Sequence, residues 1–131
     1  MTAKVPSYYR ETPQRYRYEG NSCKECGKVF FPPRIACDPF CTCTLKPHKL
    51  ALAGKVKTYT IIHIAPPGFG DEAPYALAVV ELNDGARITA QIADVPLDKV
   101  RVGLRVRIEF RLIQKDGHAG ILQYGYKVVP E

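Results

Sequence analysis

The stretch from Cys23 to Cys43, CKECGKVFFPPRIACDPFCTC, holds all five cysteines of this 131-residue chain. A Cys-x-x-Cys-Gly step presents two thiols from one tight turn, because the glycine can take a positive φ and direct backbone amides at the sulfurs. Cys37 follows at a distance that lets two short strands return the chain for a second such turn. Four thiolates at tetrahedral distance suit zinc, and a closed four-sulfur site is structural rather than catalytic. We therefore predict a rubredoxin-like zinc ribbon over residues 21–49, with Cys23, Cys26 and Cys37 among its ligands.

The fourth ligand is open between two cysteines, because Cys41 stands four positions after Cys37 and Cys43 follows two further on. Cys41 is favoured, since a one-residue insertion distorts the second turn less than a three-residue one. A disulfide framework is the alternative to a metal, but an odd cysteine count and the lack of a signal peptide weigh against it. Iron in place of zinc is also compatible with four sulfurs.

The segment between the two predicted turns, VFFPPR, is unusual for a connection that only joins two metal-binding turns. Adjacent aromatics point to opposite faces of an extended chain, so one phenylalanine can pack on the metal layer while the other faces out. Two prolines then stiffen the backbone. The alternative is that both phenylalanines pack inside the ribbon. The residues predicted to contact a partner or coenzyme A are Phe30, Phe31, Pro32 and Arg34, with Lys24 and Lys28 adding positive charge.

Residues 1–20 form a polar arm in which four tyrosines alternate with arginines. A helical turn is expected near Pro6 and Ser7. Pro13 should interrupt it, and residues 15–18 should form a strand. Arginine and tyrosine are enriched at interfaces, so the arm is either a docking segment or an amphipathic arm packed on its own domain.

Beyond a linker at residues 44–49, residues 50–131 show the pattern of a β domain. Alternating or apolar runs predict strands, of which the second should be buried on both faces. A short helix is expected over 95–100, capped by Asp94, and Asn83-Asp84-Gly85 predicts a hairpin turn. Five strands with one helix between the third and fourth is the element order of an OB-fold barrel, so the chain should be mainly β. The predicted strands cover 55–64, 75–82, 87–92, 104–112 and 122–128.

Composition narrows the functional classes. Hydrophobic residues make up 46% of the chain, enough for a packed core. No apolar run approaches the ~20 residues of a membrane span. The net charge of +6 permits an anionic partner. Five cysteines in a metal-like cluster, without a leader, point to the cytoplasm.

The string CKECGKVFFPPR, a second cysteine cluster, PYALAVVELNDGARITAQI and GLRVRIEFR together resemble one family over nearly the whole chain. It is the family of acyl-CoA-associated OB-fold proteins with a rubredoxin-like zinc ribbon, long known as a domain of unknown function. The usual second turn of that family is Cys-Pro-x-Cys, from which residues 37–43 depart. The chain is most similar to the archaeal branch, whose members accompany acetoacetyl-CoA thiolase and hydroxymethylglutaryl-CoA synthase.

The resemblance implies a non-catalytic scaffold subunit of the mevalonate pathway of isoprenoid biosynthesis. Such a subunit would bridge the two thiolase-fold enzymes and help to shape a site for coenzyme A. It would carry structural zinc and work in the cytoplasm.

Parts of the sequence are also compatible with two other functional classes. A single-stranded nucleic-acid-binding protein is the main alternative, because OB barrels, zinc ribbons and positive charge all serve that function. Phe110 and two barrel tyrosines are expected on the inward register, however, and the arginines of that strand occupy outward positions. An enzyme would need a Cys–His pair, but neither His48 nor His63 has an orienting acid at a recognisable spacing.

Overall fold

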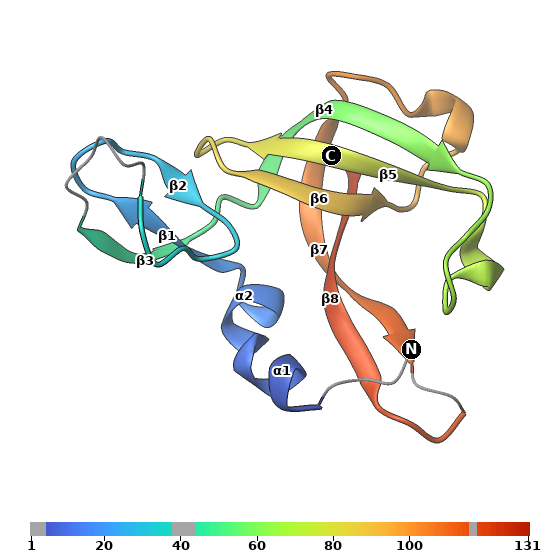
Figure 1. Ribbon diagram of the computed structural model, residues 1–131. Coiled ribbons are helices and arrows are strands. Elements are labelled where there is room, and N and C mark those ends of the chain that lie inside the picture. Colours follow the sequence, from blue (N-terminus) through green and yellow to red (C-terminus); the bar gives the residue numbers. More distant parts are fainter. Residues whose placement is uncertain (1–4, 38–43, 116–117) are drawn as a thin grey trace.

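The computed structural model describes residues 5–37, 44–115 and 118–131. A three-stranded sheet formed by the first half of the chain lies beside a closed five-stranded barrel, and the helices are short (Figure 1). The predicted mainly β architecture, a ribbon followed by an OB-fold barrel, is confirmed.

The N-terminal arm is helical, with α1 at Val5–Arg10 and α2 at Thr12–Tyr16. The predicted helical turn near Pro6 is confirmed, whereas the strand predicted over 15–18 is wrong. The predicted interruption is present, because α1 ends at Arg10 and Pro13 lies in the first turn of a second helix, α2, where a missing N–H leaves no helical hydrogen bond unmade.

The ribbon sheet consists of β1 (Glu19–Cys23), β2 (Val29–Phe30) and β3 (Leu45–Lys49), in the order β2-β1-β3 with antiparallel neighbours. The linker predicted over residues 44–49 is therefore wrong. Pro47 is accommodated because β3 is an edge strand, where an N–H can be missing. Gly20 permits the tight pairing of β1 with β2, since a Cβ there would lie 2.2 Å from the carbonyl oxygen of Phe30.

The barrel follows the OB-fold order β4-β5-β6-β8-β7. All neighbours are antiparallel except β6 and β8, which run parallel and share one paired position, Ile92 with Val128. The 3-10 helix η1 (Gly70–Glu72) lies in the loop before β5. The strands are β4 (Ala53–Ile62), β5 (Tyr75–Leu82), β6 (Arg87–Ile92), β7 (Arg105–Lys115) and β8 (Leu122–Pro130).

The helix predicted over 95–100 is present as a single 3-10 turn, η2 (Leu97–Lys99). The cap predicted at Asp94 is wrong. Asp94 takes a positive φ of 61° and its carboxylate accepts a 2.5 Å hydrogen bond from the Arg111 guanidinium. It thereby ties the loop after β6 to β7.

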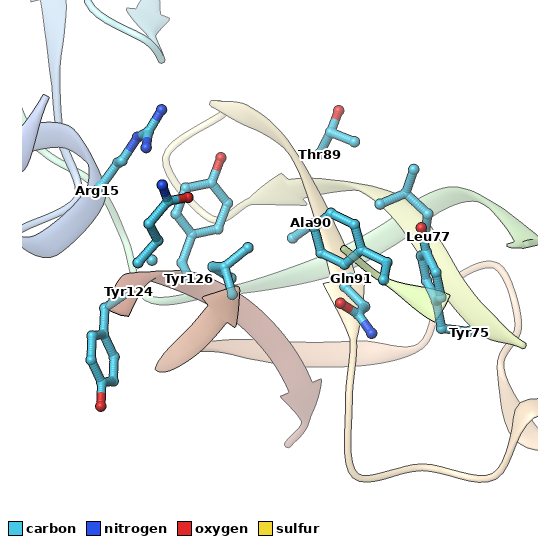
Figure 2. A pocket seen from close by; sticks show the side chains of 12 residues that line it. Arg15, Tyr75, Leu77, Thr89, Ala90, Gln91, Tyr124 and Tyr126 are labelled. Atoms are coloured by element: carbon cyan, nitrogen blue, oxygen red, sulfur yellow. The ribbon is translucent and has the colours of Figure 1, made fainter. Parts of the chain in front are cut away.

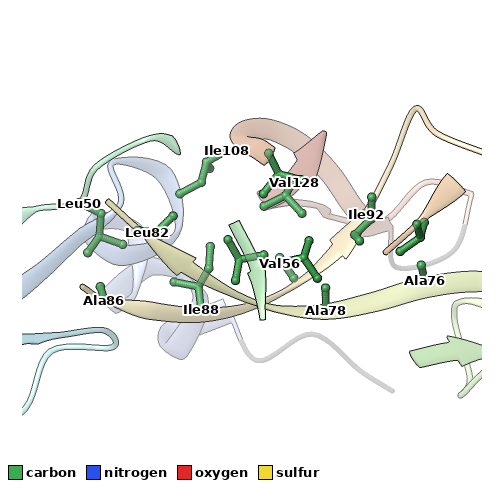
Figure 3. Packing of buried hydrophobic residues seen from close by; sticks show 14 residues of the cluster. Leu50, Val56, Ala76, Ala78, Leu82, Ala86, Ile88, Ile92, Ile108 and Val128 are labelled. Carbon is green, nitrogen blue, oxygen red and sulfur yellow. The ribbon is translucent and has the colours of Figure 1, made fainter. Parts of the chain in front are cut away.

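The barrel core is a continuous cluster of aliphatic side chains (Figure 3). The alternation of β5 brings every second residue from Ala76 to Leu82 inward, while the residues between them are half-buried. The prediction that β5 is buried on both faces is therefore only partly right. Four valines are almost fully buried: Val56, Val80, Val106 and Val128.

The β7–β8 hairpin extends beyond the barrel and lies against the helices of the arm (Figure 1). Phe110 was predicted to face the core, but it is 45% exposed, because it lies where the hairpin leaves the barrel. Its ring stacks on Tyr124 at 5.1 Å between centroids and meets the edge of Tyr16, also at 5.1 Å. The arm is thus packed on its own chain.

Tyr8 fastens the arm to the outer edge of β8. Its hydroxyl accepts a hydrogen bond from the Tyr124 amide at 3.0 Å and donates to the Leu122 carbonyl at 3.4 Å. Tyr16 donates a further hydrogen bond to the same hydroxyl, which raises the pKa of Tyr16 to about 12. A side chain therefore occupies backbone groups that would otherwise be open to another strand.

Candidate metal centre and interdomain cleft

Three cysteines converge at the end of the ribbon sheet. The sulfurs of Cys23, Cys26 and Cys37 all lie within 4.8 Å of one another, and the last two are 3.5 Å apart. Sulfurs at 2.3 Å from a tetrahedral zinc are about 3.8 Å apart. The described donor set therefore fits a zinc ion in size and in chemistry.

The turn that presents the first two sulfurs has the positive φ predicted for its glycine. Gly27 takes a φ of 72°, and its amide donates to the Cys23 carbonyl at 3.0 Å. The Cys23 amide in turn donates to the Lys28 carbonyl at 2.9 Å. Local backbone bonding thus holds Cys23, which is buried, and Cys26, which is exposed, at the same end of β1.

The fourth ligand predicted at Cys41, and its alternative Cys43, lie outside the described residues. Cys37 is disulfide-bonded in this structure. A disulfide sulfur is not a thiolate, so the disulfide and a metal compete for Cys37. The chemistry of the three converging sulfurs fits zinc when Cys37 is reduced.

Glu25 connects the cysteine cluster to the strand that follows it. One carboxylate oxygen accepts hydrogen bonds from the Thr44 amide at 3.0 Å and from the Cys23 thiol at 3.3 Å. These two hydrogen bonds, the one from Thr44 first, lower the pKa of Glu25. The Lys24 amide also donates to the Thr44 carbonyl at 3.3 Å, so the turn is pinned to the chain leading into β3.

The segment Phe30–Arg34, which begins at the last residue of β2 and which we call the finger, is held by a buried side chain that the sequence did not single out. Asn21 on β1 donates from its side-chain nitrogen to the Arg34 carbonyl at 2.5 Å and accepts from the Arg34 amide at 3.2 Å. The Arg34 guanidinium lies 4.9 Å from the centroid of the Phe30 ring, a cation–π contact. The two aromatics of the finger differ in role, because Phe31 turns to the barrel and meets Tyr126 at 5.6 Å.

A cleft of about 480 Å³ lies between the finger and the turn that joins β5 to β6. It brings together four of the six predicted contact residues, whereas Lys24 and Pro32 are exposed but do not line it. The barrel adds Arg87, a cation that sequence reasoning missed, because the Asp-Gly pair before it indicated only a turn. The lining residues are Gly27, Lys28, Val29, Phe30, Phe31 and Arg34 from the ribbon, and Asp84, Gly85 and Arg87 from the barrel.

The charge of this cleft is positive. Arg87 pairs with Glu81 at 3.2 Å and remains 67% exposed. Asp84 is the acidic residue of the lining, and its carboxylate is occupied by other partners. Three cationic side chains, Lys28, Arg34 and Arg87, therefore line the cleft.

Asp84 acts as the junction between ribbon and barrel. Its carboxylate accepts hydrogen bonds from the amides of Ala51 and Ala86 at 2.9 and 3.1 Å, and it pairs with His48 of β3 at 3.0 Å. Burial alone would raise the pKa of Asp84, but the hydrogen bonds from Ala51, His48 and Ala86 outweigh it and lower the pKa. His48, which sequence reasoning considered for catalysis, here joins two parts of the fold.

In the part of the chain that the structure describes, no helix has both the length and the apolar character needed to cross a membrane.

Comparison with known proteins agrees with this architecture. Two family models match: the ChsH2 rubredoxin-like zinc ribbon domain over residues 13–42 and the ChsH2 C-terminal OB-fold domain over residues 48–111. Among solved structures, a chain described as "Ltp2-ChsH2(DUF35) aldolase" shares the fold, with a TM-score of 0.71 and 23% identity, over 99% of this chain and 96% of that one.

Two archaeal relatives match nearly from end to end. A DUF35 domain-containing scaffold protein of Methanocaldococcus jannaschii is 44% identical over 93% of this chain and 87% of its own length. A protein of the same description from Methanothermobacter thermautotrophicus is 41% identical over 100% of this chain and 99% of its own length. With its converging cysteines, its ribbon and its barrel, the chain belongs to the family of DUF35 domain-containing scaffold proteins.

Proposed function

We propose that this chain is a non-catalytic scaffold subunit that bridges acetoacetyl-CoA thiolase and hydroxymethylglutaryl-CoA synthase in the cytoplasmic mevalonate pathway. The names of its close relatives support the scaffold role. A region similar to this chain also makes up 32% of a Thermomonospora curvata protein named as a probable enoyl-CoA hydratase alpha subunit. That name supports the association of such regions with enzymes that act on coenzyme A thioesters.

The cationic cleft is the observation that carries the coenzyme A part of the proposal. Coenzyme A bears several phosphate charges, and guanidinium groups bind phosphate through charge-assisted, often bidentate hydrogen bonds. Arg34 approaches the cleft from the finger and Arg87 from the barrel, and Lys28 adds a third positive charge. The cleft would thus hold phosphates at an enzyme interface rather than activate a reacting atom.

The ribbon gives this surface a fixed shape. Zinc, when bound, would supply structural cross-linking of Cys23, Cys26 and Cys37. The Asn21 hydrogen bonds then fix the backbone of Arg34, and Ile35 beside it is fully exposed. An exposed isoleucine next to a held arginine supplies the apolar and cationic elements that protein interfaces combine.

The experiment is a pull-down of the two enzymes by the zinc-loaded protein, with and without coenzyme A. Arg34→Ala combined with Arg87→Ala should weaken coenzyme A binding and any coenzyme A-dependent retention of the enzymes by at least ~tenfold, in line with the loss of two charged interface contacts. Arg105→Ala, on the outer face of β7, is the control. Phe31 is left intact in this design, because its contact with Tyr126 makes Phe31→Ala a change at the junction as well.

Failure of the wild-type protein to retain either enzyme would refute the bridging proposal. Retention of both enzymes by the double variant, with unchanged coenzyme A affinity, would refute the assignment of the cleft as the coenzyme A site. The proposal that the chain bridges the two enzymes would not be affected.

A further inference from the structure

The cysteine cluster and the interdomain cleft share one turn of the ribbon. Gly27 and Lys28, which line the cleft, directly follow Cys26 in the chain. The amide of Cys23 donates to the Lys28 carbonyl at 2.9 Å, and the amide of Gly27 donates to the Cys23 carbonyl at 3.0 Å. The turn that presents two of the sulfurs is therefore also part of the cleft wall.

The finger takes its place in the cleft from β1, the strand that ends at Cys23. Phe30 of β2 lies opposite Asn21 of β1 in the ribbon sheet. The Asn21 side chain also makes both hydrogen bonds to the backbone of Arg34, at 2.5 and 3.2 Å. Two lining residues of the cleft, Phe30 and Arg34, are thus aligned on a strand whose last residue is one of the three converging cysteines.

The barrel side of the cleft has a different support. Gly85 lies in the turn between β5 and β6, where its amide donates to the Leu82 carbonyl at 2.9 Å. The Asp84 carboxylate accepts from the Ala86 amide at 3.1 Å, and Arg87 is the first residue of β6. These contacts lie within the barrel. Loss of a metal should therefore loosen the ribbon side of the cleft and leave the barrel side in place.

This difference sets the cost of binding an anion between the two sides. A sheet as small as the ribbon usually needs a metal or disulfides to fold, and metal binding to such domains is coupled to their folding. Without the metal, an anion in the cleft would also have to order the ribbon, and that loss of chain entropy would reduce its affinity. With the metal bound, the ribbon side is already in place for the anion.

We propose that a metal at the cysteine cluster and a phosphate-bearing anion in the interdomain cleft bind cooperatively, with β1 and the turn after it as the connection. The class of anion rests on the proposed function, whereas the coupling is a separate claim. Thermodynamic linkage makes the effect reciprocal, because each ligand must raise the affinity for the other by the same factor. Coupling between two sites is typically about five- to 150-fold, and at least ~fivefold is expected here.

A hollow of about 330 Å³ on the barrel provides an internal control, because its lining residues come from the arm and the barrel. Figure 2 shows Arg15 and Tyr126 on one side of it and Tyr75 and Leu77 on the other. Among the described residues, its lining shares none with the metal turn or the finger. The ¹⁵N amide signals of Leu77 and Gln91 should therefore stay in place when zinc is removed, while those of the finger change.

The test measures zinc affinity and anion affinity of the full-length protein, kept reduced with a phosphine. The probe is S-methyl coenzyme A, whose methylated sulfur cannot form a thiolate that would ligate zinc. Competition with a coloured chelator should show zinc bound at least ~fivefold more tightly at saturating probe. Calorimetry should show the probe bound at least ~fivefold more tightly by the zinc-loaded than by the zinc-free protein, and the two factors should agree. Removal of zinc by the probe's phosphates in solution would have the opposite sign.

Two variants locate the coupling. Arg87→Ala is the matched control, because it removes a cationic side chain of the cleft that belongs to the barrel and not to the metal turn. Its zinc affinity without the probe should equal that of the wild type, and the probe should raise it by less than about twofold. Asn21→Ala tests the connection through β1. It should keep its zinc affinity without the probe, while the coupling factor falls to less than about half of the wild-type value.

The inference is overturned if the probe leaves the zinc affinity of the wild type unchanged, if Arg87→Ala shows the same gain, or if Asn21→Ala keeps the full coupling. Equal binding of the probe with and without zinc would overturn the coupling and still support the cleft as the coenzyme A site. A probe that binds neither form would overturn the coupling and the assignment of the cleft together. The bridge between the two enzymes is tested by the pull-down and does not depend on these affinities.

Discussion

The ribbon and the barrel of this protein are stabilised in different ways. The barrel closes around a cluster of fourteen buried apolar residues, from Leu50 to Val128. In the described part of the ribbon, the buried residues of β1 beyond Gly20 are Asn21, Ser22 and Cys23. Such a small sheet cannot bury enough apolar surface to fold on that account alone, and domains of this size usually need a metal or disulfides.

The difference indicates that the two parts respond to different perturbations. The barrel depends on packing, whereas the ribbon depends on its sulfurs and on a few specific hydrogen bonds. They meet through the Phe31–Tyr126 ring contact and the His48–Asp84 pair. A change in one part should therefore leave most of the other intact, and the following predictions test that separation.

The largest effect is expected from Cys26→Ser under reducing conditions. Removal of one thiolate should abolish tight zinc binding and unfold the ribbon, because zinc binding contributes on the order of 10 kcal/mol to the folding of small zinc domains. Elemental analysis should find about one zinc per chain in the wild type. The barrel signals in a ¹⁵N spectrum should remain dispersed, and their collapse would contradict the separation of ribbon and barrel.

The second prediction assigns the fourth ligand. Cys41→Ser should release the metal, whereas Cys43→Ser should retain it, because Cys41 follows Cys37 at the shorter spacing. Zinc content after reconstitution with a thiol reductant present measures both variants. The reverse pattern would exchange the two assignments and leave the fold unchanged.

A substitution in the hydrophobic core tests the barrel, which is the other part of this comparison. Ile88 is 3% exposed in the barrel cluster. Ile88→Ala should lower the free energy of unfolding of the barrel by about 2–5 kcal/mol through lost burial and a residual cavity. Chemical denaturation measures the loss. Zinc content should stay at the wild-type level in the folded variant, and loss of zinc from it would show that the ribbon depends on the barrel core.

The barrel was the more predictable part, because periodicity records which residues face a core. The bounds of β5 and β6 agree with the sequence pattern to the residue. The pattern of β7 misplaced Phe110, since the same alternation continues after the hairpin has left the barrel. Periodicity says which side a residue faces, but not whether anything covers that side.

The candidate site was less predictable, because it is assembled from separate segments. Cysteine spacing identifies Cys23, Cys26 and Cys37 from local sequence alone. The junction of His48 with Asp84 spans 36 positions, and the approach of Arg87 to the finger depends on how the ribbon sits on the barrel. Neither of these contacts is indicated by a pattern in the local sequence. The linker wrongly predicted over residues 44–49 has a similar cause, because β3 forms through its pairing with β1 and its own residues do not have a strand pattern.

A smaller effect is expected from Asn21→Ala, which removes both hydrogen bonds to the Arg34 backbone. Leaving partly buried backbone groups unpaired costs about 1–3 kcal/mol. The ribbon should therefore remain metal-loaded, with faster amide exchange at Arg34. Hydrogen exchange monitored by NMR measures this rate. Unchanged protection at Arg34 would mean that the prolines alone hold the finger.

The smallest expected effect concerns the junction, and it depends on pH. The folded-state pKa of Asp84 is lowered, so the folded chain stabilises its ionised form more than the unfolded chain does. Stability from this group is therefore fully present above its unfolded pKa of about 3.9 and is lost as the pH falls through the lower folded value. Asp84→Asn should destabilise the protein near neutral pH, because asparagine keeps one acceptor oxygen and its amide nitrogen cannot accept the second of the two hydrogen bonds that Ala51 and Ala86 donate.

The difference between wild type and Asp84→Asn should hold constant from pH 7 to about 5 and narrow below about 4, as wild-type Asp84 takes up its proton. Asp98→Asn, an exposed position in η2, is the matched control and should show little difference at any pH. Denaturation midpoints measured across this range provide the test. A difference that persists undiminished at pH 2 would show that Asp84 stabilises the junction through its shape rather than its charge.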